Sequence, residues 1–550
     1  MSRVKSFWNS SICRCACGLI LQAFVCLYPI YIYTILLHTG YSYIFTSFIF
    51  ALPVFVVALW IPKKWMYCVL TIILTFISIV ELTMVDLYNS FLLPGGIIST
   101  LWTNQQEASE FFETNFSEVY RWIPLIILCL ATCVIYKRPK ISKRLWIGSS
   151  LLILLPFMFV GFKVSQYAYK DNSITIRYYL NNRVWNRPPY NLFFASYQAH
   201  KLLKQRRMIA LADKMHFEAY RVDSCNQKEI YVLGIGESLR YDNLSLNGIY
   251  PRSTTPRLEA NENVVLFDNY YSQACLTMFS VPMIITRATP TNYELNFAER
   301  SIIEPFRESG FHTFVIVNKN LLSYETYLSN GCDSLFVIDN VVQNGEIISG
   351  DKTIVHIIDS LSQVHDKLFI LCQFLGNHSF YTNYEKEFDI YHPNSNDAGI
   401  GYTKETLTNA YDNSILYTDY ILSSIVNVID KENTCSAMIF VSDHGEDIGD
   451  GGGGHGGNCN PKEAEYHVPF IFCWNDKYAA TYPDKIVAAK AHRQARINGD
   501  VIFYSVCSMA GIGIDSAYMQ PTWDILSPCF LEHQRLILVP DGVSTINPDK

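Results

Sequence analysis

The sequence predicts a membrane protein in two parts: an N-terminal bundle of five membrane-spanning helices, then an α/β domain whose mostly parallel sheet is covered by helices on both faces. Two observations carry this prediction. The first 165 residues are mainly long apolar runs, although only 17% of the whole chain is charged. Beyond residue 224, short apolar runs alternate with helix-like stretches, as in parallel sheets buried on both faces.

Five apolar segments reach or approach the roughly 17–25 residues that cross a bilayer. They are residues 16–37, 43–61, 65–85, 122–136 and 145–164. The fourth is the shortest. No small-residue cleavage site follows the first, so it is interpreted as a retained anchor and not as a signal peptide.

The positive charges predict how these segments are oriented. Lys and Arg gather before the first segment, between the second and third, and between the fourth and fifth. The loops 38–42 and 86–121 are nearly free of them. By the positive-inside rule the N-terminus is cytoplasmic, and everything after residue 164 lies on the far side.

Changes in composition divide the chain into three parts: residues 1–165 form a transmembrane domain, 166–223 an interfacial bridging segment rich in Tyr and Arg, and 224–550 an external catalytic domain. In the loop 86–121, aromatic rings alternate with carboxylates, which is typical of a short interfacial helix. This loop is either a solvated connector or a site for a lipid headgroup whose ammonium would pair with Glu107.

Composition also bears on partners and on redox state. A formal net charge of −7 without a dense basic tract gives no support for a nucleic-acid partner. Of the 16 cysteines, seven lie in or beside the apolar segments, where a cysteine is usually a small hydrophobe. The nine from Cys225 onward contain no pair with zinc-finger spacing, and the sequence leaves any disulfide pairing open.

Ligand-type residues follow three of the predicted strands, at the point where each strand ends. These residues are Glu237, His378 and the pair Asp443-His444. The predicted strands are residues 230–235, 314–317, 368–374, 438–441 and 468–473. Because parallel strands end at one edge of a sheet, we expect the three groups to converge, with a hard divalent metal bound by Glu237, Asp443 and His444.

The candidate nucleophile lies between the first and second predicted strands. Thr277 stands at the expected start of a helix, where a hydroxyl can face both a metal and the helix N–H groups. Considered alone, a threonine there is more often an N-cap. A further imidazole, His455, follows the glycine run 451–454 after the Asp-His pair.

Several short motifs surround these residues. In chain order they are Gly236-Glu237-Ser238-Leu239-Arg240, Asn243, Leu246-Asn247-Gly248, Thr254-Thr255-Pro256, Thr277, Ser280-Val281-Pro282, Gly376-Asn377-His378, and Ser442-Asp443-His444-Gly445-Glu446 through to His455. Together they resemble the bacterial phosphoethanolamine transferases, which are inner-membrane enzymes with five spans and a periplasmic domain of the alkaline phosphatase/sulfatase fold. Members of that family modify lipid A, and the plasmid-borne colistin-resistance (polymyxin-resistance) proteins belong to it. The resemblance covers essentially the whole chain.

The resemblance implies an activity and a role for each site residue. It implies transfer of phosphoethanolamine from phosphatidylethanolamine, through an intermediate on Thr277, to an envelope glycolipid such as lipid A or lipopolysaccharide core. Zinc is the implied metal, although the ligand types also suit manganese. The implied residues are Glu237, Thr277, Asp443 and His444 for the metal, His378 and His455 for substrate phosphate, a second metal or a proton, and Thr103 and Glu107 for the donor headgroup.

Three departures from the family pattern are visible. Ser99 stands where lipid A enzymes usually have Asn. Gln273 and Met283 occupy the places of cysteines that normally flank the nucleophile, which leaves branches that modify core sugars or other glycans open. The glycine run 451–454 predicts a loose tether for His455.

Other activities compete with this interpretation. Sulfatase activity is set aside, because the segment 275–279 lacks the Pro and Arg of a Cys-x-Pro-x-Arg formylglycine sequence. The alternative is a phosphoglycerol transferase of the lipoteichoic-acid-synthase type, which also has five spans and a threonine nucleophile. The Gly-Glu-Ser-Leu-Arg and Thr-Thr-Pro segments favour the ethanolamine branch. A non-enzymatic membrane sensor is a third interpretation. It is disfavoured because every ligand-type residue of the expected metal site is present.

Overall fold

The chain divides into two compact units, residues 1–201 and 202–550. A computed structural model describes residues 10–36, 42–88, 90–103, 120–139, 143–168, 184–185, 187–209, 216–223, 228–318, 331–338, 341–343, 346–378, 381, 384–397, 400, 403–431, 433–449, 454–457 and 460–550. The finer division into membrane, bridging and catalytic parts stays a prediction.

The first unit is built from apolar helices. Small residues such as Ala51 and Ala58 are fully buried between them, while large apolar side chains such as Phe76 and Leu130 are more than 60% exposed, as expected for helices that face lipid. The helices are α2 (Ser11–Leu36), α3 (Ser42–Trp60), α4 (Lys64–Tyr88), α5 (Pro94–Trp102), α7 (Ile123–Ile135), α8 (Lys143–Leu152), α9 (Leu154–Ala168) and α11 (Asn191–Ile209).

Four of the five predicted spans are long and apolar enough to cross a membrane. These are Ser11–Leu36, Tyr43–Trp60, Lys64–Tyr88 and Trp146–Lys163. The fourth predicted span corresponds to α7, whose 13 residues rise only about 20 Å, less than the roughly 30 Å of a bilayer core. Five spans therefore remain a prediction, and the segment at issue is the one with the shortest apolar run.

The second unit contains a seven-stranded sheet. Its order is β3-β11-β10-β2-β9-β5-β6, so the strand of this sheet that comes first in the sequence, β2, lies at its centre. The strands are β2 (Lys228–Gly236), β3 (Val264–Leu266), β5 (His312–Asn318), β6 (Ser334–Ile338), β9 (Lys367–Gln373), β10 (Thr434–Ser442) and β11 (Phe470–Trp474).

The sheet is mixed, with a parallel majority. The neighbours β10, β2, β9, β5 and β6 run parallel, as predicted, whereas β11 is antiparallel to both β10 and β3. Parallel neighbours need a crossover of a dozen or more residues, usually a helix. Between β10 and β11 the described residues contain only the short turn η7 (Glu463–Glu465), so the chain returns alongside β10 in the opposite direction.

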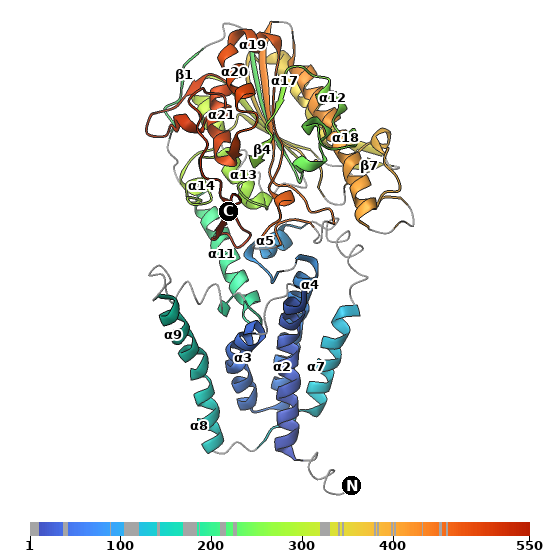
Figure 1. Cartoon of the computed structure of the whole chain (residues 1–550), viewed down its shortest axis with the longest axis vertical. Coiled ribbons are helices and arrows are strands. Elements are labelled where there is room, and N and C mark those ends of the chain that lie inside the picture. Colours follow the sequence, from blue (N-terminus) through green and yellow to red (C-terminus); the bar gives the residue numbers. More distant parts are fainter. Residues whose placement is uncertain are drawn as a thin grey trace. The chain divides into compact units, whose positions relative to one another are not determined.

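Helices cover both faces of this sheet, as the continuous apolar strands predict. Figure 1 shows α17 (Asp351–Val364) and α18 (Lys404–Ile429) along one side of the sheet, and α20 (Pro483–Ala491) and α21 (Ile502–Met509) along the other. On the α17 and α18 side, alternate strand residues such as Ile230 and Val232 form one large buried core with the helices. These layers leave the carboxyl ends of the parallel strands free to build a site.

Candidate active site

The carboxyl ends of the two central strands carry the acids of the site. β2 and β10 are paired with Gly236 opposite Ser442, so Glu237 and Asp443 leave the sheet side by side. The Asp443 amide donates to the Gly236 carbonyl at 3.1 Å, which extends the pairing beyond the strands. Gly236 cannot carry a side chain here without rearrangement, because an added Cβ would lie 2.5 Å from the Phe440 ring.

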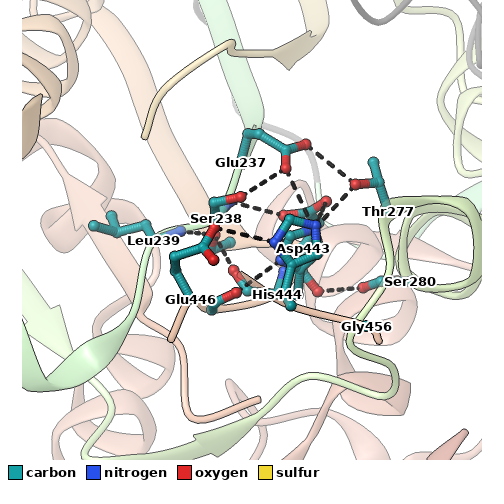
Figure 2. Close-up of polar contacts among 12 residues, drawn as sticks. Glu237, Ser238, Leu239, Thr277, Ser280, Asp443, His444, Glu446 and Gly456 are labelled. Carbon is teal, nitrogen blue, oxygen red and sulfur yellow. Dashed lines mark hydrogen bonds and ion pairs between the residues drawn. The ribbon is translucent and has the colours of Figure 1, made fainter. Parts of the chain in front are cut away.

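Four side chains meet just beyond these strand ends (Figure 2). Thr277 Oγ1 lies 3.3 Å from Glu237 Oε2 and 3.1 Å from His444 Nε2. His444 Nε2 lies 3.3 Å from Glu237 Oε1 and 3.4 Å from Asp443 Oδ2. Glu237, Asp443 and His444 are at most 1% exposed. The four residues that the resemblance implies as metal ligands therefore form one cluster, in which Thr277 is partly buried.

Burial and close contact shift the pKa values of this cluster in opposite directions. Burial raises the pKa of Asp443, and repulsion by Glu237 adds to it, so that the value is about 7. Burial lowers the pKa of His444, but attraction to Asp443 and Glu237 outweighs burial and raises it to about 10. Burial opposes ionisation of Glu237 too, yet the adjacent His444 lowers the pKa of Glu237 well below its usual range. Strong shifts with a named charge partner are typical of functional sites.

The Asp443 carboxylate shows that the cluster fits a cation. Among the described residues, its buried Oδ2 has no hydrogen-bond partner at normal distance and lies 3.4 Å from His444 Nε2. An unsatisfied buried charged oxygen costs more than the roughly 1–3 kcal/mol of a neutral one. Carboxylate oxygens and imidazole nitrogens are the ligands that zinc accepts. Ligand atoms of Glu237, His444 and His455 all lie within 4.8 Å of one another.

Thr277 begins α13 (Thr277–Ile285), and its hydroxyl faces the cluster. The N-cap of this helix is Leu276, in an extended conformation without a side-chain cap, so Thr277 does not act as the N-cap. The dipole of a helix favours an anion at its N-terminal end. One turn further on, the Ser280 hydroxyl donates to the Asp443 carbonyl, which ties α13 to the ligand loop.

Ser238 holds two of the acids at once, a role that the motif containing it did not reveal. Its hydroxyl donates to Glu237 Oε1 at 2.9 Å, and its amide donates to Asp443 Oδ1 at 3.2 Å. Its φ of +59° lies in the left-handed region, which costs a residue with a side chain about 1–2 kcal/mol. The Tyr411 hydroxyl on α18 donates to the Ser238 carbonyl at 2.6 Å and helps to hold this conformation.

The loop after β10 is closed by tight contacts. Ser442 Oγ accepts the Leu239 amide and donates to the His444 carbonyl, both at 2.9 Å. Gly445 packs against the chain so closely that an added Cβ would lie 2.0 Å from the Ala464 carbonyl oxygen. A glycine is therefore required immediately after the Asp443-His444 pair.

His455 is held more firmly than its glycine run suggests. Its Nδ1 lies 3.1 Å from Oε2 of the fully buried Glu446, and its ring centroid is 3.8 Å from that of His444. Two backbone hydrogen bonds between Asp447 and Gly454, at 3.0 and 3.1 Å, close the base of the loop. Burial and the nearby His444 lower the pKa of His455, which favours a neutral imidazole. With Nδ1–H donated to Glu446, Nε2 is available as a proton acceptor.

His378 lies at the same edge of the sheet. It ends the turn that follows β9, and the turn is fixed by Asp351, whose carboxylate accepts the Leu375 and Gly376 amides at 3.0 and 2.9 Å. His378 is close enough to Glu237 for its charge to contribute to the lowered pKa of that carboxyl. The expected convergence of three strand ends is thus found.

The remaining predicted site residues belong to the first unit. Thr103 directly follows α5, is exposed, and donates its hydroxyl to the Ser99 carbonyl at 2.8 Å. Glu107 lies outside the described residues. Its predicted contact with a headgroup stays a prediction.

The structure shows no disulfide between the cysteines that it describes in the second unit. They are Cys275, Cys332, Cys372, Cys435, Cys473, Cys507 and Cys529. Cys275, next to the start of α13, is buried, whereas Cys225 and Cys459 lie outside the described residues.

Comparison with known proteins places this site in a family. Phosphoethanolamine transferase EptA of Escherichia coli strain K12 is 26% identical over 430 residues, which are 74% of this chain and 75% of that protein. The integral membrane protein lipooligosaccharide phosphoethanolamine transferase A from Neisseria meningitidis has the same fold, with a TM-score of 0.73 and 20% identity over 94% of this chain and 98% of that one. The C-terminal periplasmic domain of E. coli EptC, in complex with Zn, matches with a TM-score of 0.53 and 24% identity over 62% of this chain and 97% of that one.

The sulfatase family model matches residues 229–512, which is more than half of the 550 residues and includes every second-unit residue of the candidate site. The chain therefore belongs to the sulfatase family.

Proposed function

We propose that this chain is a zinc-dependent phosphoethanolamine transferase that uses Thr277 as its nucleophile. The observation that carries the proposal is the position of Thr277 Oγ1, within 3.3 Å of both Glu237 Oε2 and His444 Nε2 at the start of a helix. The donor is phosphatidylethanolamine, and the acceptor is an envelope glycolipid, lipid A or lipopolysaccharide core. The similarity to EptA supports this choice within the family.

The residue at the nucleophile position argues against sulfate-ester chemistry. Sulfatases need formylglycine, made from a Cys or Ser in a defined segment, and this chain has Thr277 inside Cys275-Leu-Thr-Met-Phe279. A threonine hydroxyl can form a phosphodiester with a transferred group and release it again, which suits a two-step phosphotransfer.

Glu237, Thr277, Asp443 and His444 are the residues that would hold the zinc ion, and the zinc-bound EptC domain supports zinc as the metal. When bound, a zinc ion lowers the pKa of a coordinated hydroxyl and offsets charge on an attacked phosphate. Ser238 keeps two of the carboxylates oriented for this purpose.

In the first step, Thr277 Oγ1 forms a bond to the phosphorus of phosphatidylethanolamine, the bond from phosphorus to the diacylglycerol oxygen breaks, and a proton goes to that oxygen. In the second step, an oxygen of the acceptor hydroxyl or phosphate loses its proton, if it carries one, and forms a bond to the same phosphorus. The bond from phosphorus to Thr277 Oγ1 breaks, and Oγ1 takes up a proton. His455, neutral and with Nε2 available, is suited to move these protons, and His378 is the second candidate.

The membrane part of the proposal follows the charge pattern. We propose five spans, with α7 as the short one, a cytoplasmic N-terminus and a periplasmic catalytic domain anchored in the inner membrane. In this arrangement residues 1–165 form the membrane domain, 166–223 the bridge and 224–550 the catalytic domain. Thr103 and Glu107 would contact the donor headgroup.

The test is mass spectrometry of envelope glycolipids from cells with and without the protein. A phosphoethanolamine increment on lipid A or on core sugar supports the proposal and identifies the acceptor. A phosphoglycerol increment would instead support the lipoteichoic-acid-synthase alternative. The variant Thr277→Ala, which should be present in the membrane in normal amounts, must lose the increment, and undiminished transfer by this variant contradicts the assignment of the nucleophile.

A further inference from the structure

A carboxylate is completely buried among the apolar helices of the first unit. This is Glu81 of α4; the other acid of α4, Asp86, forms an ion pair with Arg121 at 2.8 Å, and α2, α3 and α7 contain no acidic residue. A charged side chain inside membrane helices is costly, faces the interior of the bundle, and marks a function in most proteins that have one. The contacts of Glu81 show what it holds.

Glu81 binds two segments that are distant in sequence. Its Oε2 accepts the Leu92 amide at 3.0 Å, and the Asn191 side-chain amide lies 3.0 and 3.1 Å from its two oxygens. The same Asn191 amide donates to the Leu92 carbonyl at 2.7 Å, so the three groups form a closed set. Leu92 and Asn191 are both at most 5% exposed.

Each of these two partners of Glu81 lies at or just before the start of another helix. Leu92 lies two residues before α5, and Thr103, the residue proposed to contact the donor headgroup, directly follows that helix. Asn191 is the first residue of α11, the helix that continues towards the catalytic unit in sequence. Arg187 and Tyr190 fasten the same stretch to α3, through the Thr46 hydroxyl at 2.8 Å and the Phe50 carbonyl at 2.9 Å.

Another buried polar group of α4, Thr75, behaves differently. Its hydroxyl donates to the Thr71 carbonyl one turn earlier in the same helix, at 2.8 Å. Such a bond satisfies a hydroxyl within one helix and fixes nothing outside it. Among the residues that the structure describes, Glu81 accepts hydrogen bonds from groups of other segments only.

We propose that Glu81 is a positioning residue for the donor lipid: it fixes the segment that carries Thr103 and the start of α11 to one point of the helix bundle. This inference rests on the proposed function, because it assumes that the Thr103 segment contacts the headgroup of a membrane lipid. A glutamine at this position can still accept the Leu92 amide, but its own amide then faces that of Asn191.

The test compares Glu81→Gln with Thr75→Val, which removes a buried hydroxyl that bonds only to its own helix. Full-length proteins are reconstituted in vesicles that contain phosphatidylethanolamine. Glu81→Gln should raise KM for the membrane lipid about tenfold or more, the effect of losing a hydrogen bond to a charged group, with kcat nearly unchanged. The same increase in KM is expected for a water-soluble short-chain phosphatidylethanolamine, which carries the same headgroup, and Thr75→Val should match wild type for both substrates.

Two further measurements keep the inference separate from the proposed function. Hydrogen exchange of the peptides that cover residues 90–103 should accelerate in Glu81→Gln and Asn191→Ala but not in Thr75→Val, whatever reaction the enzyme performs. In a double-mutant cycle of Glu81→Gln and Asn191→Ala, the double variant should raise KM no more than the single variant that has the larger effect. Unchanged exchange in Glu81→Gln, or a fall in kcat with KM unchanged, overturns the positioning role. Absence of all transferase activity in wild type would instead contradict the proposed function.

Discussion

Replacement of Ser238 by alanine tests how the acids of the site are held. The change removes the 2.9 Å hydrogen bond from the Ser238 hydroxyl to Glu237 Oε1 and leaves the amide bond to Asp443 in place. A hydrogen bond to a charged group contributes about 1.5–3 kcal/mol. Loss of a group that orients a metal ligand typically lowers metal affinity about 10–100-fold. We therefore expect Ser238→Ala to bind zinc about 10–100-fold more weakly than wild type.

Ser238→Gly separates the hydroxyl from the backbone strain. Both variants lack the hydroxyl, but only glycine adopts a φ of +59° without the cost of a side chain. The glycine variant should bind zinc as weakly as the alanine variant, and its zinc-free form should be about 1 kcal/mol more stable to unfolding than that of the alanine variant. Zinc affinity is measured by competition with a chromogenic chelator, and stability by urea denaturation.

Two results would refute this reasoning. Wild-type zinc affinity in Ser238→Ala would show that the hydroxyl does not orient Glu237. A glycine variant with restored zinc affinity would show that the conformation of the backbone, and not the hydroxyl, determines metal binding.

Three other predictions concern the same edge of the sheet. Gly445→Ala should destabilise the protein by about 1–3 kcal/mol, because its Cβ would lie 2.0 Å from the Ala464 carbonyl oxygen; a thermal unfolding curve that matches wild type would contradict this. Glu446→Gln should lower the pKa of His455 further, because the Glu446 carboxylate raises it, and an unchanged or higher value in an NMR titration of the histidines would show that the 3.1 Å contact is not formed. Removal of zinc with a chelator should abolish transfer and lower the melting temperature. The lost stability is about 2.7 kcal/mol when the untreated protein is measured with free zinc at 100 times its Kd. A chelated protein that melts like the untreated one would mean that the cluster binds no metal.

The sequence predicted which residues meet at the edge of the sheet, because this follows from where the strands end. Apolar runs ending in Glu237, His378 and Asp443 located the edge of the sheet, because parallel strands end together and their order need not be known for their ends to meet. The direction of β11 was not predictable from the same pattern, since a buried antiparallel strand and a buried parallel strand have the same apolar composition.

Other features were not predictable because they depend on contacts between distant segments. A serine with a positive φ has no local signal, and the role of Ser238 follows only from Asp443 and Tyr411 meeting it in space. The glycine run before His455 suggested freedom, whereas the contact with Glu446 holds this imidazole in place. The contacts of Glu81 were not predictable from the apolar run around it, because its partners are 11 and 110 residues away in the sequence.

The central claim is that Thr277 carries the transferred group, and it is tested most directly by trapping that group. The full-length protein in vesicles with phosphatidylethanolamine, but without acceptor, is digested and examined by mass spectrometry. We predict one phosphoethanolamine group on the peptide that contains Thr277, an equimolar release of diacylglycerol, and neither product from Thr277→Ala. A phosphoethanolamine group on another residue, or diacylglycerol released at the wild-type rate by Thr277→Ala, would contradict the account.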